Sequence, residues 1–152
     1  MEVRVALDHD ASRIAELFVQ LEYAATPTEL ALRLPRLLRH PDTEVLIAAQ
    51  DGQVHGVLVL NMLHPLHVPR AWAVISALVV DETQRSQGAG AALVGAAESE
   101  AVRRGCAHVE LSCSVRRTRA HAFYEAMGFE EVRTRLVKNL ASAALAAVAG
   151  NA

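Results

Sequence analysis

A glycine-containing segment in the middle of the chain carries the residue types of an anion-binding turn. Residues 84–91 read Gln-Arg-Ser-Gln-Gly-Ala-Gly-Ala and stand between a strongly apolar stretch and an alanine-rich one. Backbone N–H groups at the start of a helix attract anions, and glycines let a ligand approach them closely. Arg85 adds a positive charge. The segment is therefore predicted either to hold a phosphate group or to be an ordinary turn from a strand into a helix.

The spacing of these residues differs from two common nucleotide-binding motifs. A Walker A loop would end in Lys followed by Ser or Thr, and the segment contains neither of these pairs. The dinucleotide-binding motif GxGxxG would need a third glycine at the position that Leu93 occupies. The segment therefore matches neither motif, and a phosphate bound here would belong to another class of ligand.

Hydrophobic periodicity predicts the elements that must position the segment. The nearly all-apolar stretch 71–80 is typical of a buried central strand. Asp51-Gly52 between two apolar runs predicts a hairpin, and Pro35 predicts a break or kink in a helix. The expected elements, in order, are a strand over 2–7, helices over 10–23 and 27–38, strands over 44–50, 55–63 and 71–80, a helix over 89–104, a strand over 108–114, a helix over 118–127 and a last strand over 131–140.

The composition indicates one globular α/β domain over residues 1–140, followed by an alanine-rich tail over 141–152. The formal net charge of −2 lacks the basic excess that binding to nucleic acid or an anionic membrane requires. No apolar run reaches the roughly 20 residues of a membrane span. Cys106 and Cys113 do not form a CxxC pair, and the N-terminus lacks a signal-peptide core, so we expect a reduced protein in the cytoplasm.

Two blocks of sequence together resemble the linked motifs of the GNAT family of acyl-CoA N-acyltransferases. The first is SALVVDETQRSQGAGAALVGAAESEAVRRG (76–105) and the second is AHAFYEAMGF (120–129). They stand in the family's order, and the resemblance covers residues 2–140. It implies the GNAT fold, in which helices flank a mixed central sheet whose central strands splay apart. It also implies acetyl-CoA as co-substrate, and no metal is expected.

The resemblance assigns roles to residues of both blocks. The tyrosine of the second block, Tyr124, is implied to protonate the departing thiolate of the coenzyme, for which a phenol with a pKa of about 10 is suited at neutral pH. The backbone of Leu78, Val79 and Val80 is implied to pair with the pantetheine arm. The pyrophosphate-binding segment is implied to consist of Arg85, Ser86, Gln87, Gly88, Ala89, Gly90 and Ala91.

The general base is the first departure from the family pattern. Many relatives carry a glutamate on the central strand at the place of Val74, and the strand 71–80 contains neither carboxylate nor histidine. The candidates that remain open are Glu22, His64, His67 and a chain of water molecules, which Ser76 would help to position. His64 and His67 lack a third ligand at a known spacing, which argues against a metal site.

Arg117 is the second departure, because relatives usually carry asparagine at this place. The variant SCSVRRTRAHAFYEAMGF (112–129) is similar to aminoalkylphosphonate acetyltransferases and their small-amine relatives. Arg116, Arg117 and Arg119 would then contact the coenzyme's phosphates or an anionic substrate, or they form a solvated basic edge.

The functional hypothesis is an acetyl-CoA-dependent N-acetyltransferase that acts on a primary amine of a small molecule. Two alternatives remain open: acetylation of protein N-termini or lysines, and a non-catalytic module that binds acyl-CoA and regulates a partner. The identity of the amine is not encoded in any diagnostic pattern of the sequence. Members of the family are often dimers, so a homodimer is a further expectation.

Overall fold

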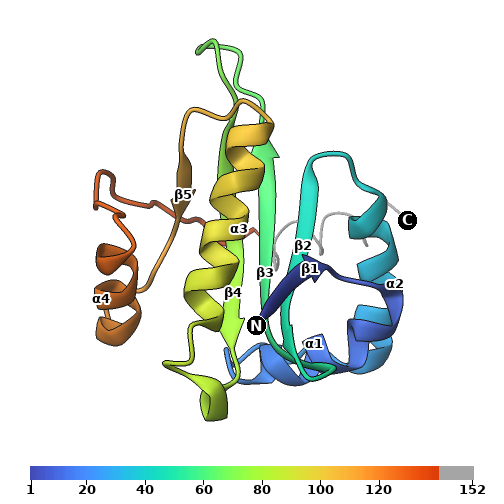
Figure 1. The fold of residues 1–152 in the computed structure, drawn as a ribbon. Coiled ribbons are helices and arrows are strands. Elements are labelled where there is room, and N and C mark those ends of the chain that lie inside the picture. Colours follow the sequence, from blue (N-terminus) through green and yellow to red (C-terminus); the bar gives the residue numbers. More distant parts are fainter. Residues whose placement is uncertain (141–152) are drawn as a thin grey trace.

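A five-stranded sheet separates two layers of helices (Figure 1). The computed structural model describes residues 1–140, and the alanine-rich tail predicted over 141–152 lies outside the described residues. The spatial order of the strands follows the chain, with antiparallel pairing up to β4 and a parallel pair between β4 and β5. The strands are β1 (Glu2–Val5), β2 (Thr43–Gln50), β3 (Gln53–Leu63), β4 (Trp72–Val80) and β5 (Val109–Leu111).

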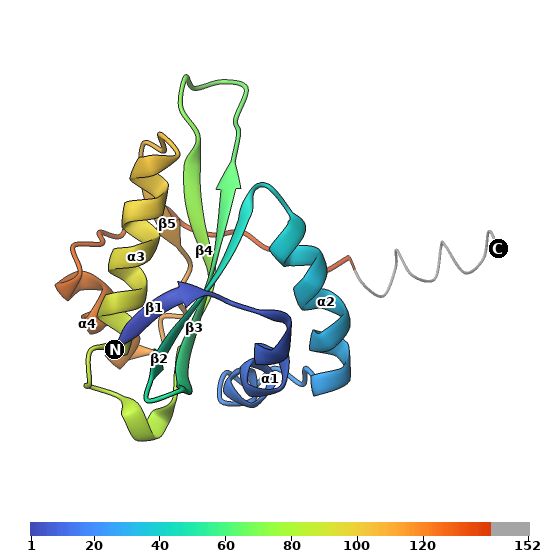
Figure 2. The same cartoon turned by 45° about the vertical axis from the view of Figure 1, so that its right-hand side comes forward.

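Each face of the sheet is covered by its own helices, as Figure 2 shows. The helices α1 and α2, which we call the amino-terminal layer, pack on one face through Ile14, Leu17 and Leu30. The helices α3 and α4 lie on the other face, where Leu93 and Phe123 belong to a second apolar cluster. The helices are η1 (Asp8–Asp10), α1 (Ala11–Val19), α2 (Pro27–Arg39), η2 (Glu82–Gln84), α3 (Ala89–Arg103) and α4 (Thr118–Ala126).

Local sequence signals account for several element boundaries. Thr26 and Glu29 form a capping box at the start of α2, in which each side chain accepts a hydrogen bond from the other's backbone N–H. Asp51 and Gly52 both have positive φ angles, 52° and 76°, as a two-residue hairpin turn of type I′ requires. The α/β fold class and the hairpin predicted from sequence are therefore confirmed.

Some predicted elements were wrong in their extent. The helix α2 continues through Pro35: Leu30 and Leu34 before the proline are buried, and Leu38 after it packs against the same apolar cluster. The first helix ends at Val19 instead of residue 23, and β5 has three residues instead of seven. Tertiary packing, which a local pattern does not contain, sets these limits.

The last strand predicted over 131–140 does not form. After α4 the chain crosses from the α4 side to the α2 side of the molecule as an irregular, exposed segment (Figures 1 and 2). Val132, Leu136 and Val137 are all exposed. A strand needs a neighbouring edge to pair with, and β5 offers an edge of only three residues. Alternation of polar and apolar residues was therefore an insufficient signal here.

Gly56 on β3 allows α3 to lie close to the sheet. A Cβ atom at this position would lie 3.0 Å from Cδ1 of Leu93 and 3.2 Å from the carbonyl oxygen of Val79. Leu93 is fully buried and fixes the middle of α3 on β3. Gly95, two residues further along α3, has open space in the direction of a Cβ atom.

The substitution Gly56→Ala should lower the free energy of unfolding by about 1–3 kcal/mol, because the added methyl group meets a backbone oxygen and a fixed core side chain. Gly95→Ala adds the same atom without a clash and removes a glycine from a helix, so it should raise stability by about 0.5–1 kcal/mol. Urea unfolding of both variants measures the difference. Equal stabilities would contradict the close contact between α3 and β3.

Candidate functional site

The two parallel strands β4 and β5 are paired only over three residues. Ala73 pairs with Val109 and Ile75 with Leu111, after which β5 ends while β4 continues to Val80. On its other edge β4 stays paired with β3 as far as Val80. One backbone edge of β4 beyond Ile75 therefore lies outside the strand pairs of the described chain, and an extended ligand could pair with it. Leu78, Val79 and Val80, predicted to bind pantetheine, lie on this stretch.

A β-bulge bends β4 at the place where the two strands separate. Val59 of β3 pairs with Ala77, whereas the next residue, Leu60, pairs with Ile75, so Ser76 is an extra residue on β4. A bulge of this kind turns the strand locally and disrupts the regular ladder. The Oγ atom of Ser76 accepts a hydrogen bond from Nδ2 of Asn61 at 2.8 Å. The bulge is thus held by a polar pair on the sheet surface.

The glycine-containing segment predicted from sequence forms an exposed loop that leads into α3. Ser86 and Gly88 both have left-handed backbone angles, with φ of 70° and 88°, and Gly88 is the N-cap of α3. A Cβ atom at Gly88 would meet nothing within 4 Å, so the space above it is open. Ala89, the first helical residue, is buried and anchors the loop in the core. The first-turn N–H groups therefore face an accessible position suited to an anion.

Asp81 fixes the start of this loop, and sequence reasoning missed it. Its carboxylate accepts hydrogen bonds from the backbone N–H and the hydroxyl of Thr83 at 2.9 and 2.7 Å. It also forms an ion pair with Arg13 of α1, whose Nε donates to the carbonyl oxygen of Val54 at 3.0 Å. Asp81 is buried, and its own backbone N–H donates to the carbonyl oxygen of His55. An aspartate directly after the last residue of β4 was the available sequence signal.

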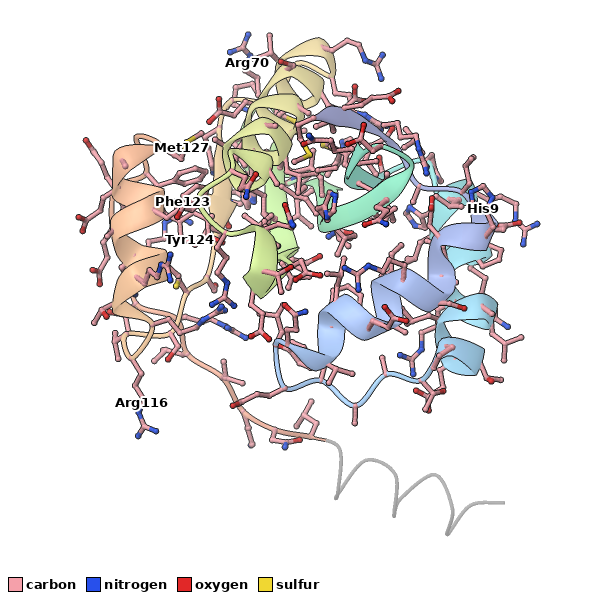
Figure 3. The ribbon with its side chains drawn as sticks, turned by 60° about the horizontal axis from the view of Figure 1, so that its bottom comes forward. His9, Arg70, Arg116, Phe123, Tyr124 and Met127 are labelled. Carbon is pink, nitrogen blue, oxygen red and sulfur yellow. The ribbon has the colours of Figure 1, made fainter. Side chains whose placement is uncertain are left out.

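The helix α4 packs against the start of α3 and thereby brings Tyr124 near the loop. A Cβ atom at Gly90 would lie 3.2 Å from Cζ of Phe123, so the absence of a side chain at Gly90 makes room for the phenylalanine ring. Figure 3 shows Phe123, Tyr124 and Met127 on the side of α4 that faces the sheet. Arg119, also on α4, donates to Oγ of Ser86 at 3.5 Å. The two sequence motifs are therefore in contact.

Tyr124 is a half-buried side chain in an aromatic environment. The ring of Phe123 lies edge-on at 5.2 Å and that of Phe129 at 5.8 Å. Burial raises the pKa of the Tyr124 phenol above its usual value of 10, and the neighbouring Cys113 thiol acts in the same direction. The phenol is therefore protonated at neutral pH and available as a hydrogen-bond or proton donor.

The three arginines singled out at the start of α4 do not form one cluster. Arg116 points away from the body of the molecule in Figure 3, whereas Arg119 reaches the loop through Ser86. Arg117 lines a pocket of about 220 Å³ together with Gln20, Leu21 and Glu22 at the end of α1. A larger hollow of about 310 Å³ lies on α4 and contains none of the predicted site residues; it is lined by Val115, Thr118, His121, Ala122 and Glu125.

The candidate bases from sequence lie at different places. Glu22 borders the pocket beside Arg117 and has a left-handed backbone with φ of 64°. Nε2 of His64 lies 2.8 Å from the carboxylate of Asp42, so its ring is drawn toward the start of β2. His67 contacts the ring of Trp72 edge-on, with ring centroids 6.2 Å apart. Within residues 1–140, no three His, Cys, Asp or Glu side chains come together as a metal-binding group.

Comparison with known proteins decides the family. The model of the acetyltransferase (GNAT) family matches residues 9–129. The chain belongs to the GNAT acetyltransferase family. It is 31% identical over 144 residues to the aminoalkylphosphonate N-acetyltransferase of Salmonella typhimurium, a match that covers 91% of each chain. The family and this relative make the protein an N-acetyltransferase.

Solved structures of GNAT proteins share the fold. A putative acetyltransferase from Agrobacterium tumefaciens is 25% identical with a TM-score of 0.84, and the match covers 91% of this chain and 99% of that one. Glucosamine-6-phosphate N-acetyltransferase from Arabidopsis thaliana is 21% identical with a TM-score of 0.80, with 91% and 97% covered. The GNAT fold expected from the two motifs is therefore confirmed. No helix within the described residues is long and apolar enough to cross a membrane.

Asp81 generates a prediction about stability in acid. Hydrogen bonds from Thr83, together with Arg13, hold the pKa of Asp81 at about 2, below its usual 3.8. Because the folded-state pKa is depressed, the stabilisation is present above about pH 4 and is lost as the pH falls toward 2. The isosteric change Asp81→Asn should lower the free energy of unfolding by about 2 kcal/mol at neutral pH and by much less near pH 2.

The control for this prediction is Asp51→Asn in the exposed hairpin turn, since asparagine also tolerates a positive φ. Denaturant unfolding of both variants, measured between roughly pH 2 and 7, gives the difference at each pH. A loss of stability in Asp81→Asn that is independent of pH would contradict the role assigned to the carboxylate charge.

Proposed function

We propose that this N-acetyltransferase transfers the acetyl group of acetyl-CoA to a primary amine of a small molecule. The observation that carries the proposal is the contact between Gly90 and Phe123. It joins the glycine-containing loop 84–91 to α4, the helix that bears Tyr124. An acyl donor with a phosphate group at one end and a thioester at the other needs both features on one surface. The open edge of β4 leads into this loop, because β4 ends at Val80.

The residues of the loop and of β4 suit the two polar parts of coenzyme A. The N–H groups of residues 86–91 at the start of α3 would bind the pyrophosphate, with Arg85 adding positive charge. The backbone of Leu78, Val79 and Val80 would pair with the amides of the pantetheine arm. The open space above Gly88 supports this assignment, since any side chain there would occupy the approach to the N–H groups.

Tyr124 would act as the proton donor to the departing thiolate. The phenol is half-buried and its pKa is raised by burial, which keeps the proton on the oxygen until the C–S bond breaks. The edge-on rings of Phe123 and Phe129 hold the tyrosine ring in place. A positioned donor of this kind contributes to the transition state more than to the binding of either substrate.

The choice of a small-molecule acceptor is supported by two observations. The Salmonella relative is named for an aminoalkylphosphonate substrate, and the pocket beside Arg117 has a volume of about 220 Å³. This volume lies below the roughly 300–1,000 Å³ of sites for drug-sized ligands, so the pocket would admit only a small acceptor. Arg117 would attract a substrate that carries an acidic group in addition to its amine. Acetylation of a protein terminus or lysine is the alternative that an acceptor panel tests.

The proposed compartment is the reducing cytoplasm. Both cysteines are free thiols: Sγ of Cys106 lies 3.6 Å from Sδ of Met62, and Sγ of Cys113 lies 3.8 Å from the carbonyl oxygen of Ser114. Free thiols are typical of proteins that are kept reduced. Acetyl-CoA as donor fits the same compartment.

The assay that tests the proposal measures release of free thiol from acetyl-CoA in the presence of single amines. The panel contains 2-aminoethylphosphonate, a polyamine, an aminoglycoside and a lysine-containing peptide. Thiol release with a small amine supports the proposal, and release with the peptide alone favours a protein substrate. Binding of acetyl-CoA without thiol release for any acceptor would favour the non-catalytic module.

Gly88→Val should weaken acetyl-CoA binding by about tenfold or more, equal to about 1.4 kcal/mol, because the side chain fills the space above the loop. The matched control is Gly105→Val at the end of α3. Gly105 also has a positive φ, of 75°, and open space around it, so it bears the same backbone strain away from the loop. Calorimetry compares the two affinities. Equal affinities in two folded variants would remove the pyrophosphate assignment.

Tyr124→Phe should leave acetyl-CoA affinity near the wild-type value and lower the single-turnover rate by about 10²-fold. The substitution keeps the aromatic packing and deletes only the donor. Rapid-quench measurement of one turnover is preferred, because product release can limit the steady-state rate and conceal the change. A rate within about threefold of wild type would make Tyr124 a packing residue.

A further inference from the structure

The strand β5 carries a carboxylate, Glu110, beside the position on β4 where many relatives have a glutamate and this chain has Val74. Val74 of β4, which stands where many relatives have a glutamate, pairs in register with Glu110 of β5. Side chains of residues that pair across two strands project to the same face of the sheet. The carboxylate absent from β4 is therefore present one strand away, on the same face.

The face on which Glu110 lies follows from its neighbours. Val109 and Leu111 pack into the apolar cluster beneath α3, so Glu110 projects from the opposite face, which is the face of the amino-terminal layer. Asn61, the β3 partner of Val74, is on that face as well, and its side chain donates to Ser76 at the bulge. Glu110 thus lies near the bulge, one residue before the pairing of β4 and β5 ends.

The side chain of Glu110 is both held in place and open to solvent. Its Oε2 atom lies 3.0 Å from Nε2 of His108, and the two side chains are 40% and 44% exposed. The imidazole of His108 is stacked on the indole of Trp72, with ring centroids 5.4 Å apart and an angle of 16° between the planes. A carboxylate oriented by a fixed histidine can accept a proton and pass it to water through the imidazole.

We propose that Glu110 is the general base that deprotonates the ammonium group of the acceptor. The inference rests on the proposed function. Glu110 takes one proton from R–NH3⁺, and the neutral nitrogen attacks the thioester carbonyl carbon. The C–N bond forms and the C–S bond breaks. The thiolate receives the proton of Tyr124, and the second proton of the nitrogen returns to the tyrosine oxygen. His108 relays the first proton from Glu110 to solvent.

The other candidates are less well placed for this step. His64 contacts the carboxylate of Asp42 at 2.8 Å, beside the start of β2, which is separated from β4 by β3. Glu22 borders the pocket formed with Arg117, where it would lie at the acidic end of the acceptor, and no strand pairing connects it with the separation of β4 and β5. Glu110 pairs with Val74, and the next pair, Ile75 with Leu111, is the last between β4 and β5.

The test compares Glu110→Gln with Glu130→Gln, an exposed glutamate in the segment after α4. Single-turnover acetylation of 2-aminoethylphosphonate and ethylamine should fall by about 10²-fold in Glu110→Gln and stay unchanged in Glu130→Gln. Acetyl-CoA affinity, measured by calorimetry, should be the same in both. The loss should be much smaller with 2,2,2-trifluoroethylamine, which has almost the same shape as ethylamine and is far less basic. A residue with a merely structural role would affect both amines equally.

A second variant keeps the inference falsifiable if the glutamine variant folds poorly. Glu110→Ala leaves space for a small carboxylate, so added formate should restore part of its rate, whereas formate should leave the wild type unchanged. Wild-type enzyme that releases no thiol with any amine would contradict the proposed function. An active wild type with equal rates in Glu110→Gln would overturn only the assignment of Glu110, and a comparable loss in Glu22→Gln would transfer the role to Glu22.

Discussion

The early separation of two parallel strands is the constraint on which the rest of the structure depends. Three residue pairs hold β4 and β5 together, and the bulge at Ser76 bends β4 just where the pairing stops. Backbone groups beyond this point belong to a strand that stays paired with β3 but has no strand neighbour on its other side. The molecule therefore presents an incomplete sheet, which an extended amide-containing ligand would complete. The loop follows this edge directly along the chain, and α4 contacts the loop and the start of α3.

Small residues determine how closely the other elements approach that edge. Gly56 lets Leu93 hold α3 against β3, and Gly90 lets Phe123 hold α4 against the start of α3. The first contact fixes α3 relative to the sheet, and the second fixes α4, which bears Tyr124, relative to α3. The relative positions of β3, α3 and α4 are thus fixed by close apolar packing, in which an additional methyl group has no space.

Much of this arrangement was predictable from the sequence, and the parts that were not have a common physical origin. The start of α3 at Ala89, the hairpin at Asp51 and the strand β4 all follow from local signals in glycine placement and hydrophobic pattern, although β4 is buried only at Ala73, Ile75 and Val79. The absent strand over 131–140 and the short β5 depend on which edge is available for pairing. The ion pair of Arg13 with Asp81 depends on tertiary contact, and local patterns contain neither kind of information.

The bond between Arg13 and Asp81 joins residues 68 positions apart in the chain, and this separation has a consequence for assembly. The loop that follows Asp81 is anchored only after α1 has docked on a sheet whose strand β4 is made much later. Loop closure over such a distance is slow relative to local helix formation. The ordered form of this loop should therefore be among the last features that a growing or refolding chain acquires, and any ligand bound there would in turn stabilise α1 against local opening.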